Sequence, residues 1–184
     1  MSFVDHTIES APAAARRPME AVLKKTGYLP AAVARLAESP QLLDGFLRMS
    51  GLFETTTLSP LAREVLIMTV ATRNACHVCV AMHSAKLPSV GANPDQIAAL
   101  REGRPLDDAP LEALRLFVLE VLATSGAVSA EALEEFLAHG YTRQNALEVV
   151  LGISAYTMST LANRMTEAPL DEALRPFAWT EPAA

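Results

Sequence analysis

Residues 59–86 read SPLAREVLIMTVATRNACHVCVAMHSAK, and this stretch decides the fold. Ser59 can cap the start of a helix, and Pro60 suits the first helical position. The apolar residues that follow recur at helical spacing. The stretch therefore predicts one helix over residues 59–74 and a second over residues 76–86, joined by a short turn.

The rest of the chain repeats these helical signals. Ala and Leu are abundant, 51% of the residues are hydrophobic and only 5% are aromatic, a balance that favours helices over sheets. We therefore expect an all-α fold. Proline starts and helical periodicity predict further helices, of which the first begins near Pro30 and the others cover residues 40–53, 93–101, 111–124, 130–138 and 143–165.

A chain of 184 residues is long enough for one sizeable core, and we expect a single domain over residues 19–170. Residues 1–18 are small, polar and interrupted by proline, which predicts a loose N-terminal arm. Residues 171–184 are expected to form a C-terminal tail, in which Trp179 packs on the core or on a neighbouring subunit.

The formal charge of −6 argues against a nucleic-acid or an anionic membrane partner, because phosphates repel a net acidic surface. No secretory signal and no membrane-spanning run is expected, so we expect a cytoplasmic protein. That compartment keeps thiols reduced, so the two cysteines need a reason other than a structural disulfide.

Cys76, Cys79 and His83 are spaced three and four residues apart, so on a helix they lie within about 60° of one another. A Cys-x-x-Cys pair at a helix start favours a thiolate and can close a disulfide. An imidazole one turn later can act as its base or proton shuttle. The pattern predicts a redox or catalytic centre, and the helix position favours Cys76 as the thiol with the lower pKa.

Three other interpretations remain open at this stage. If the two helices form an antiparallel hairpin, Glu64 can approach His83 and orient it, although a salt-bridged surface residue is the simpler reading of a lone glutamate. A zinc site could use both cysteines, His83 and a fourth ligand such as His77, but no second ligand pair exists. The cysteines could also be inert core residues.

The pattern of Glu64 followed by Asn74-x-Cys76-x-x-Cys79-x-x-x-His83 resembles the core motif of the alkylhydroperoxidase D family, within the carboxymuconolactone decarboxylase-like superfamily. The resemblance extends more loosely over residues 50–165. It implies an all-α fold that assembles into homotrimers or homohexamers. It also implies a thiol peroxidase or disulfide reductase activity without cofactor or metal.

The resemblance further implies roles for the four site residues. Cys79 would be the peroxidatic thiol that becomes a sulfenic acid, and Cys76 would act as proton donor and resolve it as a disulfide. Glu64 and His83 would form a proton relay. The substrate would be a hydroperoxide or a disulfide, and the reductant an external dithiol or a protein, with a peroxiredoxin as a candidate partner.

One departure from the family pattern affects the finer relay. Peroxidase members often carry a histidine directly before the second cysteine, whereas here His77 follows the first and Val78 takes that place. Separately from this departure, two alternatives stand beside the peroxidase. One is a carboxymuconolactone decarboxylase-like lyase, and the other is a redox-sensing or metal-binding helical protein without catalysis.

Overall fold

Helices alone build this fold, as the sequence predicts. The computed structural model describes residues 3–181, and within that range it contains no strand. None of the described helices is both long enough and apolar enough to cross a membrane. The elements are α1 (Ala13–Thr26), α2 (Ala31–Leu36), α3 (Pro40–Glu54), α4 (Pro60–Arg73), α5 (His77–Lys86), η1 (Leu87–Val90), α6 (Pro94–Glu102), α7 (Ala109–Ala123), α8 (Ala130–Ala138), α9 (Arg143–Met165) and η2 (Glu172–Phe177), where η marks a 3-10 helix.

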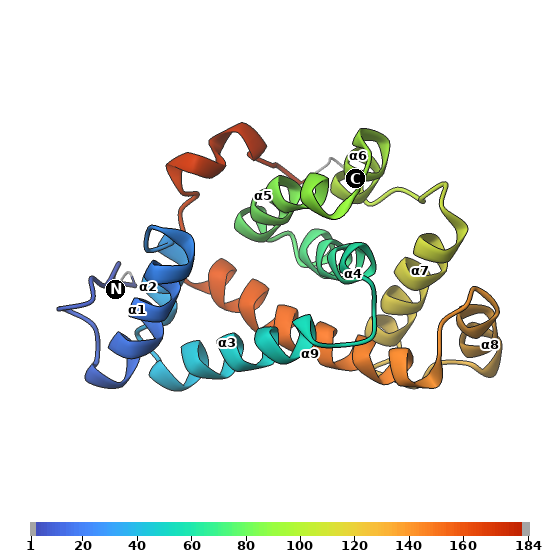
Figure 1. Ribbon diagram of the computed structural model, residues 1–184, viewed down its shortest axis with the longest axis horizontal. Helices are drawn as coiled ribbons and strands as arrows, with labels where there is room; N and C mark the ends of the chain where they lie inside the picture. Colours follow the sequence, from blue (N-terminus) through green and yellow to red (C-terminus); the bar gives the residue numbers. More distant parts are fainter. Residues whose placement is uncertain (1–2, 182–184) are drawn as a thin grey trace.

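Helix α4 lies at the centre of the molecule (Figure 1). It is buried on every face, since all of residues 64–71 are buried. A helix of this kind is stable only when other elements surround it. Helices α5, α6, α7 and α9 supply that cover, so the glutamate on α4 is held inside the protein.

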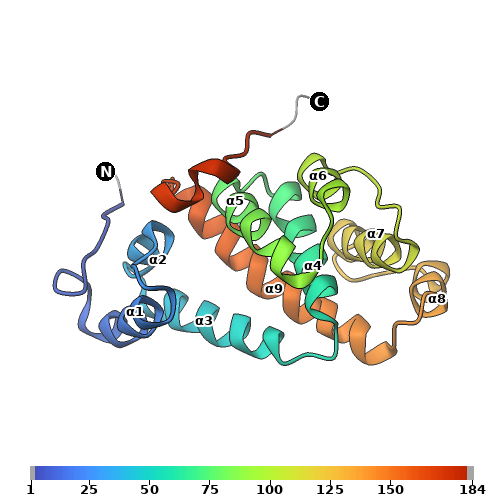
Figure 2. The ribbon, with the colours of Figure 1, turned by 45° about the horizontal axis from the view of Figure 1, so that its top comes forward.

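Helix α9 packs along both α3 and α4. Gly152 is what lets it come so close, because a Cβ at this position would lie 2.6 Å from Cε2 of Phe53 and 2.8 Å from Cδ2 of Leu66. The second half of α9 then runs towards the turn between α4 and α5. Helices α1 and α2 lie at one end of the molecule and α7 and α8 at the other (Figure 2).

The prediction of a loose arm over residues 1–18 is wrong from residue 13 onward, because helix α1 begins at Ala13. Pro18 lies inside this helix, where it removes only one backbone hydrogen bond. Ala15 and Met19 share a face of α1, and both are fully buried in a cluster that α3 completes. This tertiary packing outweighs the cost of the proline. Residues 1–2 of the arm lie outside the described residues.

The C-terminal tail packs on the core of its own chain. Its 3-10 helix η2 contacts α5. Trp179 donates its indole N–H to the carbonyl oxygen of Arg101 at 2.8 Å, and the Arg101 guanidinium donates back to the carbonyls of Phe177 and Ala178. Residues 182–184 of the predicted tail lie outside the described residues, and the division into domain, arm and tail stays a prediction.

Candidate active site

A tight turn between α4 and α5 places the first cysteine. Ala75 adopts the left-handed conformation with φ of 51°, which residues other than glycine rarely do. The N–H of Cys76 donates to the carbonyl of Ala71 at 2.9 Å and so closes the end of α4. Cys76 becomes the N-cap of α5. The hairpin that the sequence predicted therefore forms, with the thiols at its bend.

The two cysteines are free, buried and in direct contact. Their Sγ atoms lie 3.0 Å apart, within hydrogen-bonding distance and close enough for a disulfide to form with little movement. Cys76 is 1% and Cys79 5% exposed. The side-chain amide of Asn163 on α9 donates to Sγ of Cys79 at 3.4 Å.

The two thiols hold their protons with different strengths. The hydrogen bond from Cys79 lowers the pKa of Cys76 to about 7, and the backbone N–H groups at the start of α5 and the Asn163 amide act in the same direction. The same thiol contact, together with burial, raises the pKa of Cys79 well above its usual value. Cys76 is thus the thiol of the pair that ionises first.

Glu64 and His83 form a second buried pair, and His83 lies one helical turn after Cys79 on α5. Oε2 of Glu64 lies 2.7 Å from Nδ1 of His83, and Glu64 is only 1% exposed. Its other oxygen, Oε1, forms an ion pair with Nζ of Lys86 at 2.8 Å. Burial alone would raise the pKa of Glu64, but the charges and hydrogen bonds of His83 and Lys86 outweigh it and lower that pKa.

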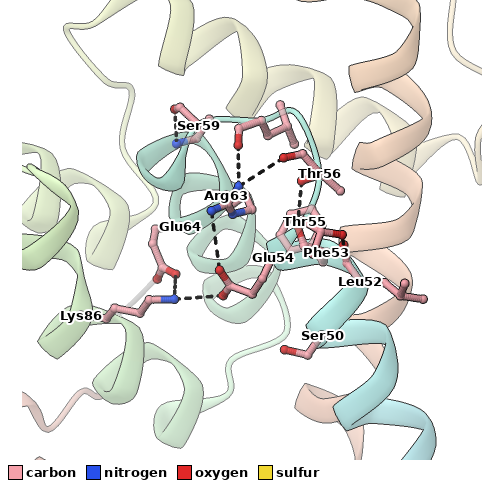
Figure 3. A network of polar contacts seen from close by, with 12 residues as sticks. Ser50, Leu52, Phe53, Glu54, Thr55, Thr56, Ser59, Arg63, Glu64 and Lys86 are labelled. Carbon is pink, nitrogen blue, oxygen red and sulfur yellow. Dashed lines mark hydrogen bonds and ion pairs between the residues drawn. The ribbon is translucent and has the colours of Figure 1, made fainter.

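Lys86 links this buried carboxylate to a second, exposed one. Nζ of Lys86 also lies 3.1 Å from Oε1 of Glu54 at the end of α3, and Glu54 in turn pairs with Arg63 at 3.6 Å (Figure 3). Burial opposes the charge of Lys86, but the two carboxylates prevail and raise its pKa. Glu64 is therefore held as an anion between two positively polarised partners.

The imidazole ring of His83 also packs edge-on against Tyr156 of α9, with centroids 5.6 Å apart. The Tyr156 hydroxyl contacts the Ser50 hydroxyl at 3.3 Å, and burial raises the pKa of Tyr156 to about 12. Tyr156 is thus a neutral phenol at physiological pH. Because Glu64 takes one ring nitrogen and Tyr156 packs on the ring, the orientation of His83 is fixed.

The structure brings the four predicted residues into two adjacent pairs, Cys76 with Cys79 and Glu64 with His83. Within residues 3–181 no hydrogen bond joins His83 to either sulfur. His77 is half-buried, and its side chain makes no hydrogen bond in the same range. No three His, Cys, Asp or Glu side chains in the described part gather as metal ligands would.

Three residues around the site were not singled out from the sequence as part of it. The sequence places Lys86 at the end of one predicted helix and Asn163 within the predicted helix over residues 143–165, with no role at the site for either. Tyr156 was not considered at all. Asn163 is 84 residues from Cys79 in the sequence, and no local sequence pattern predicts a contact over that separation. The i, i+3 spacing of His83 and Lys86 was the one available signal, since both can face the same carboxylate.

The fold and the site define a helical protein with a free Cys-x-x-Cys pair and a buried Glu–His pair, and comparisons with known proteins show what the chain is similar to. Residues 40–120 match the carboxymuconolactone decarboxylase family. This segment contains all four predicted site residues. No curated protein matches the chain in sequence.

Solved structures share the fold over almost the whole chain. A peroxidase-related protein from Ralstonia eutropha JMP134, described as an alkylhydroperoxidase AhpD core, has a TM-score of 0.80 at 20% identity and covers 94% of this chain and 93% of its own. A peroxidase-related protein from Silicibacter sp. TM1040 gives 0.77 at 19%, with the same coverage. The debrominase Bmp8, as a cysteine variant in complex with 2,3,4-tribromopyrrole, gives 0.72 at 16% and covers 96% of this chain and 94% of its own.

The TM-scores establish a common fold, and at these sequence identities they establish no more than the fold. The predicted resemblance is confirmed at the level of the fold: the chain has an alkylhydroperoxidase D-like fold, and its residues 40–120 match the carboxymuconolactone decarboxylase family.

Proposed function

We propose that this protein is a thiol-dependent oxidoreductase that reduces hydroperoxides with the Cys76/Cys79 pair and is regenerated by an external dithiol. The observation that carries the proposal is the contact between two free, buried thiols of unequal acidity, 3.0 Å apart at the start of a helix. One thiolate and one thiol in contact are what a two-electron reduction followed by disulfide closure requires.

In the proposed cycle the shared proton first moves from Cys79 to Cys76. The Cys79 thiolate attacks the distal oxygen of the hydroperoxide, the O–O bond breaks, and Cys79 is oxidised to a sulfenic acid. The leaving alkoxide takes the proton of Cys76 and departs as an alcohol. Cys76, with its pKa of about 7, is well suited both to give that proton and to be ionised again.

The Cys76 thiolate then attacks the sulfur of the Cys79 sulfenic acid. The S–S bond forms, the S–O bond breaks, and hydroxide leaves and is protonated to water. We assign the relay of that proton to His83: the ionised Glu64 holds Nδ1, and Nε2 takes up a proton from solvent and passes it to the leaving hydroxide. An external dithiol reduces the disulfide by thiol exchange and completes the cycle.

The proposal includes an assembly of three or six copies. Helix α9 exposes apolar side chains along its length, including Leu147 at 74%, Leu161 at 53% and Met165 at 71%. Side chains of this size in a row are typical of a surface that a partner subunit covers. A peroxiredoxin remains a candidate reductant or acceptor.

The proposed activity is tested by steady-state turnover of an organic hydroperoxide with dithiothreitol or dihydrolipoamide as reductant. We expect turnover in the wild type and loss of more than roughly a hundredfold in both Cys76→Ser and Cys79→Ser. Unchanged turnover in Cys79→Ser would contradict the proposal. Activity that survives complete thiol alkylation would instead indicate the lyase alternative.

A further inference from the structure

Helix α9 forms several hydrogen bonds with the turn and helix that carry the cysteines. Thr160 accepts a hydrogen bond from the Asn74 side chain at 2.9 Å, and Arg164 donates to the Asn74 carbonyl at 2.7 Å. Asn163 lies between these two residues and reaches Cys79. The α9 face is therefore fixed relative to the two sulfurs.

The side chain of Asn163 is only half satisfied. Its Nδ2 donates to Cys79 Sγ at 3.4 Å, whereas its Oδ1 is buried and has no hydrogen-bond partner among the described residues. The residue is 5% exposed. Buried carbonyl oxygens without a donor are rare because the loss of hydration is not compensated. Because the unpartnered Oδ1 belongs to the same amide that contacts Cys79, we infer that its hydrogen-bond donor is a group formed at this sulfur during the reaction.

The neighbouring hydroxyls on α9 differ from Asn163 because neither offers an unpartnered acceptor. The Ser159 hydroxyl donates to the Tyr156 carbonyl at 3.2 Å, and the Thr160 hydroxyl donates to the same carbonyl at 2.7 Å. The Ser159 hydroxyl also lies within hydrogen-bonding reach of Cys79 and acts to lower the pKa of that thiol, as the Asn163 amide does. Asn163 is the α9 side chain that offers both an N–H and a vacant acceptor beside Cys79.

We propose that Asn163 is a catalytic residue: its amide N–H binds the Cys79 thiolate, and its Oδ1 accepts a hydrogen bond from the hydroxyl of the Cys79 sulfenic acid. The inference rests on the proposed peroxidase function. The hydroxyl concerned is the distal oxygen of the substrate, which stays on sulfur with its proton after the O–O bond breaks. One amide thus serves the sulfur before oxidation with its donor and after oxidation with its acceptor.

Two substitutions separate the two halves of this role. Asn163→Leu keeps the size of the side chain and removes both polar groups. Asn163→Asp keeps the shape and an acceptor but removes the N–H and adds a negative charge. Thr166→Val is the matched control, because the Thr166 hydroxyl is buried one turn later on the same helix end and bonds only to backbone carbonyls.

All variants are made in a Cys76→Ser parent, so that Cys79 is the single thiol and its sulfenic acid cannot close a disulfide. The first readout is the pH dependence of Cys79 alkylation by iodoacetamide, which does not depend on peroxidase activity. The second is the yield of dimedone-trapped sulfenic acid after one equivalent of cumene hydroperoxide. Circular dichroism establishes that each variant is folded.

We expect Asn163→Leu to move the half-maximal alkylation of Cys79 up by roughly one pH unit and to slow sulfenic acid formation roughly tenfold or more, as loss of a hydrogen bond to a charged group does. Asn163→Asp should shift the alkylation at least as far, because its added charge also opposes the thiolate, but its sulfenic acid should live longer than that of Asn163→Leu. Thr166→Val should match the parent in both readouts.

Parent-like alkylation and trapping in Asn163→Leu would overturn the inference while leaving the proposed function standing. A parent that forms no sulfenic acid would overturn the proposed function and with it the role of Oδ1. In that case the alkylation profile alone would still decide whether the Asn163 N–H binds the Cys79 anion.

Discussion

Replacement of Glu64 by glutamine removes the buried negative charge of the site with almost no change of shape. Glu64 is 1% exposed, lies 2.7 Å from His83 and 2.8 Å from Lys86, and is the only partner of the His83 Nδ1 atom in the described range. Breaking a fully buried ion pair costs about 3–5 kcal/mol. The Lys86 side chain is 41% exposed and keeps its ion pair with Glu54. We therefore expect a smaller loss, about 2 kcal/mol in the free energy of unfolding.

The loss should also depend on pH in a defined direction. The pKa of Glu64 is lowered in the folded protein, so its contribution to stability is present above its unfolded pKa of about 4.3 and disappears as the pH falls through the folded value. The wild type should exceed Glu64→Gln in stability at pH 7. The difference should narrow in acid and vanish once the pH falls below the lowered pKa of Glu64 in the folded protein.

Urea unfolding at pH 7 and at pH 4, together with hydroperoxide turnover, measures these effects. Glu54→Gln is the matched control, since it removes the other carboxylate of Lys86 but is 41% exposed in its side chain, and it should change stability by less than about 0.5 kcal/mol. Turnover should fall in Glu64→Gln because His83 loses the carboxylate that orients it. Equal stability and turnover in the two variants would refute this reasoning.

Three further predictions follow from the geometry. Iodoacetamide should modify Cys76 of the reduced wild type before Cys79, with a half-maximal rate near pH 7, as its lowered pKa requires; peptide mapping that finds Cys79 modified first would contradict it. Gly152→Ala should lower the free energy of unfolding by about 2 kcal/mol in a urea titration, because its Cβ would meet Phe53 at 2.6 Å, and an unchanged midpoint would show that α9 is free to shift. Leu161→Glu should reduce the mass of the assembly in light scattering while Leu23→Glu, on the remote α1, should not; an unchanged mass in Leu161→Glu would exclude α9 from the interface.

The predicted helices agree with the structure wherever start signals and periodicity coincide. Ser59 caps α4 by accepting from the Ala62 N–H, and Thr142 caps α9 by accepting from the Asn145 N–H. These are local interactions, so neighbouring residues determine them. Helix α1 was missed because Pro18 is locally unfavourable, and only burial of Ala15 and Met19 against α3 stabilises it.

The residues of the site also divide into those that local sequence predicts and those that only tertiary packing brings in. The face shared by Cys76, Cys79 and His83 could be read from a helical spacing, and Glu64 followed once two helices were placed in a hairpin. The partners that complete the site come from the far end of the chain, as Asn163 and Tyr156 do. Contacts of this kind depend on how α9 packs, which Gly152 permits and no sequence pattern specifies.

The central claim is that the two contacting thiols act as one redox unit, and a single turnover tests it most directly. The pre-reduced protein is mixed with one equivalent of an organic hydroperoxide in a stopped-flow instrument, and free thiols and the product mass are determined before and after. The account predicts rapid consumption of one peroxide, loss of both thiols and a mass lower by two hydrogens, with no disulfide in Cys76→Ser or Cys79→Ser. Thiols that remain free while the peroxide persists would contradict it.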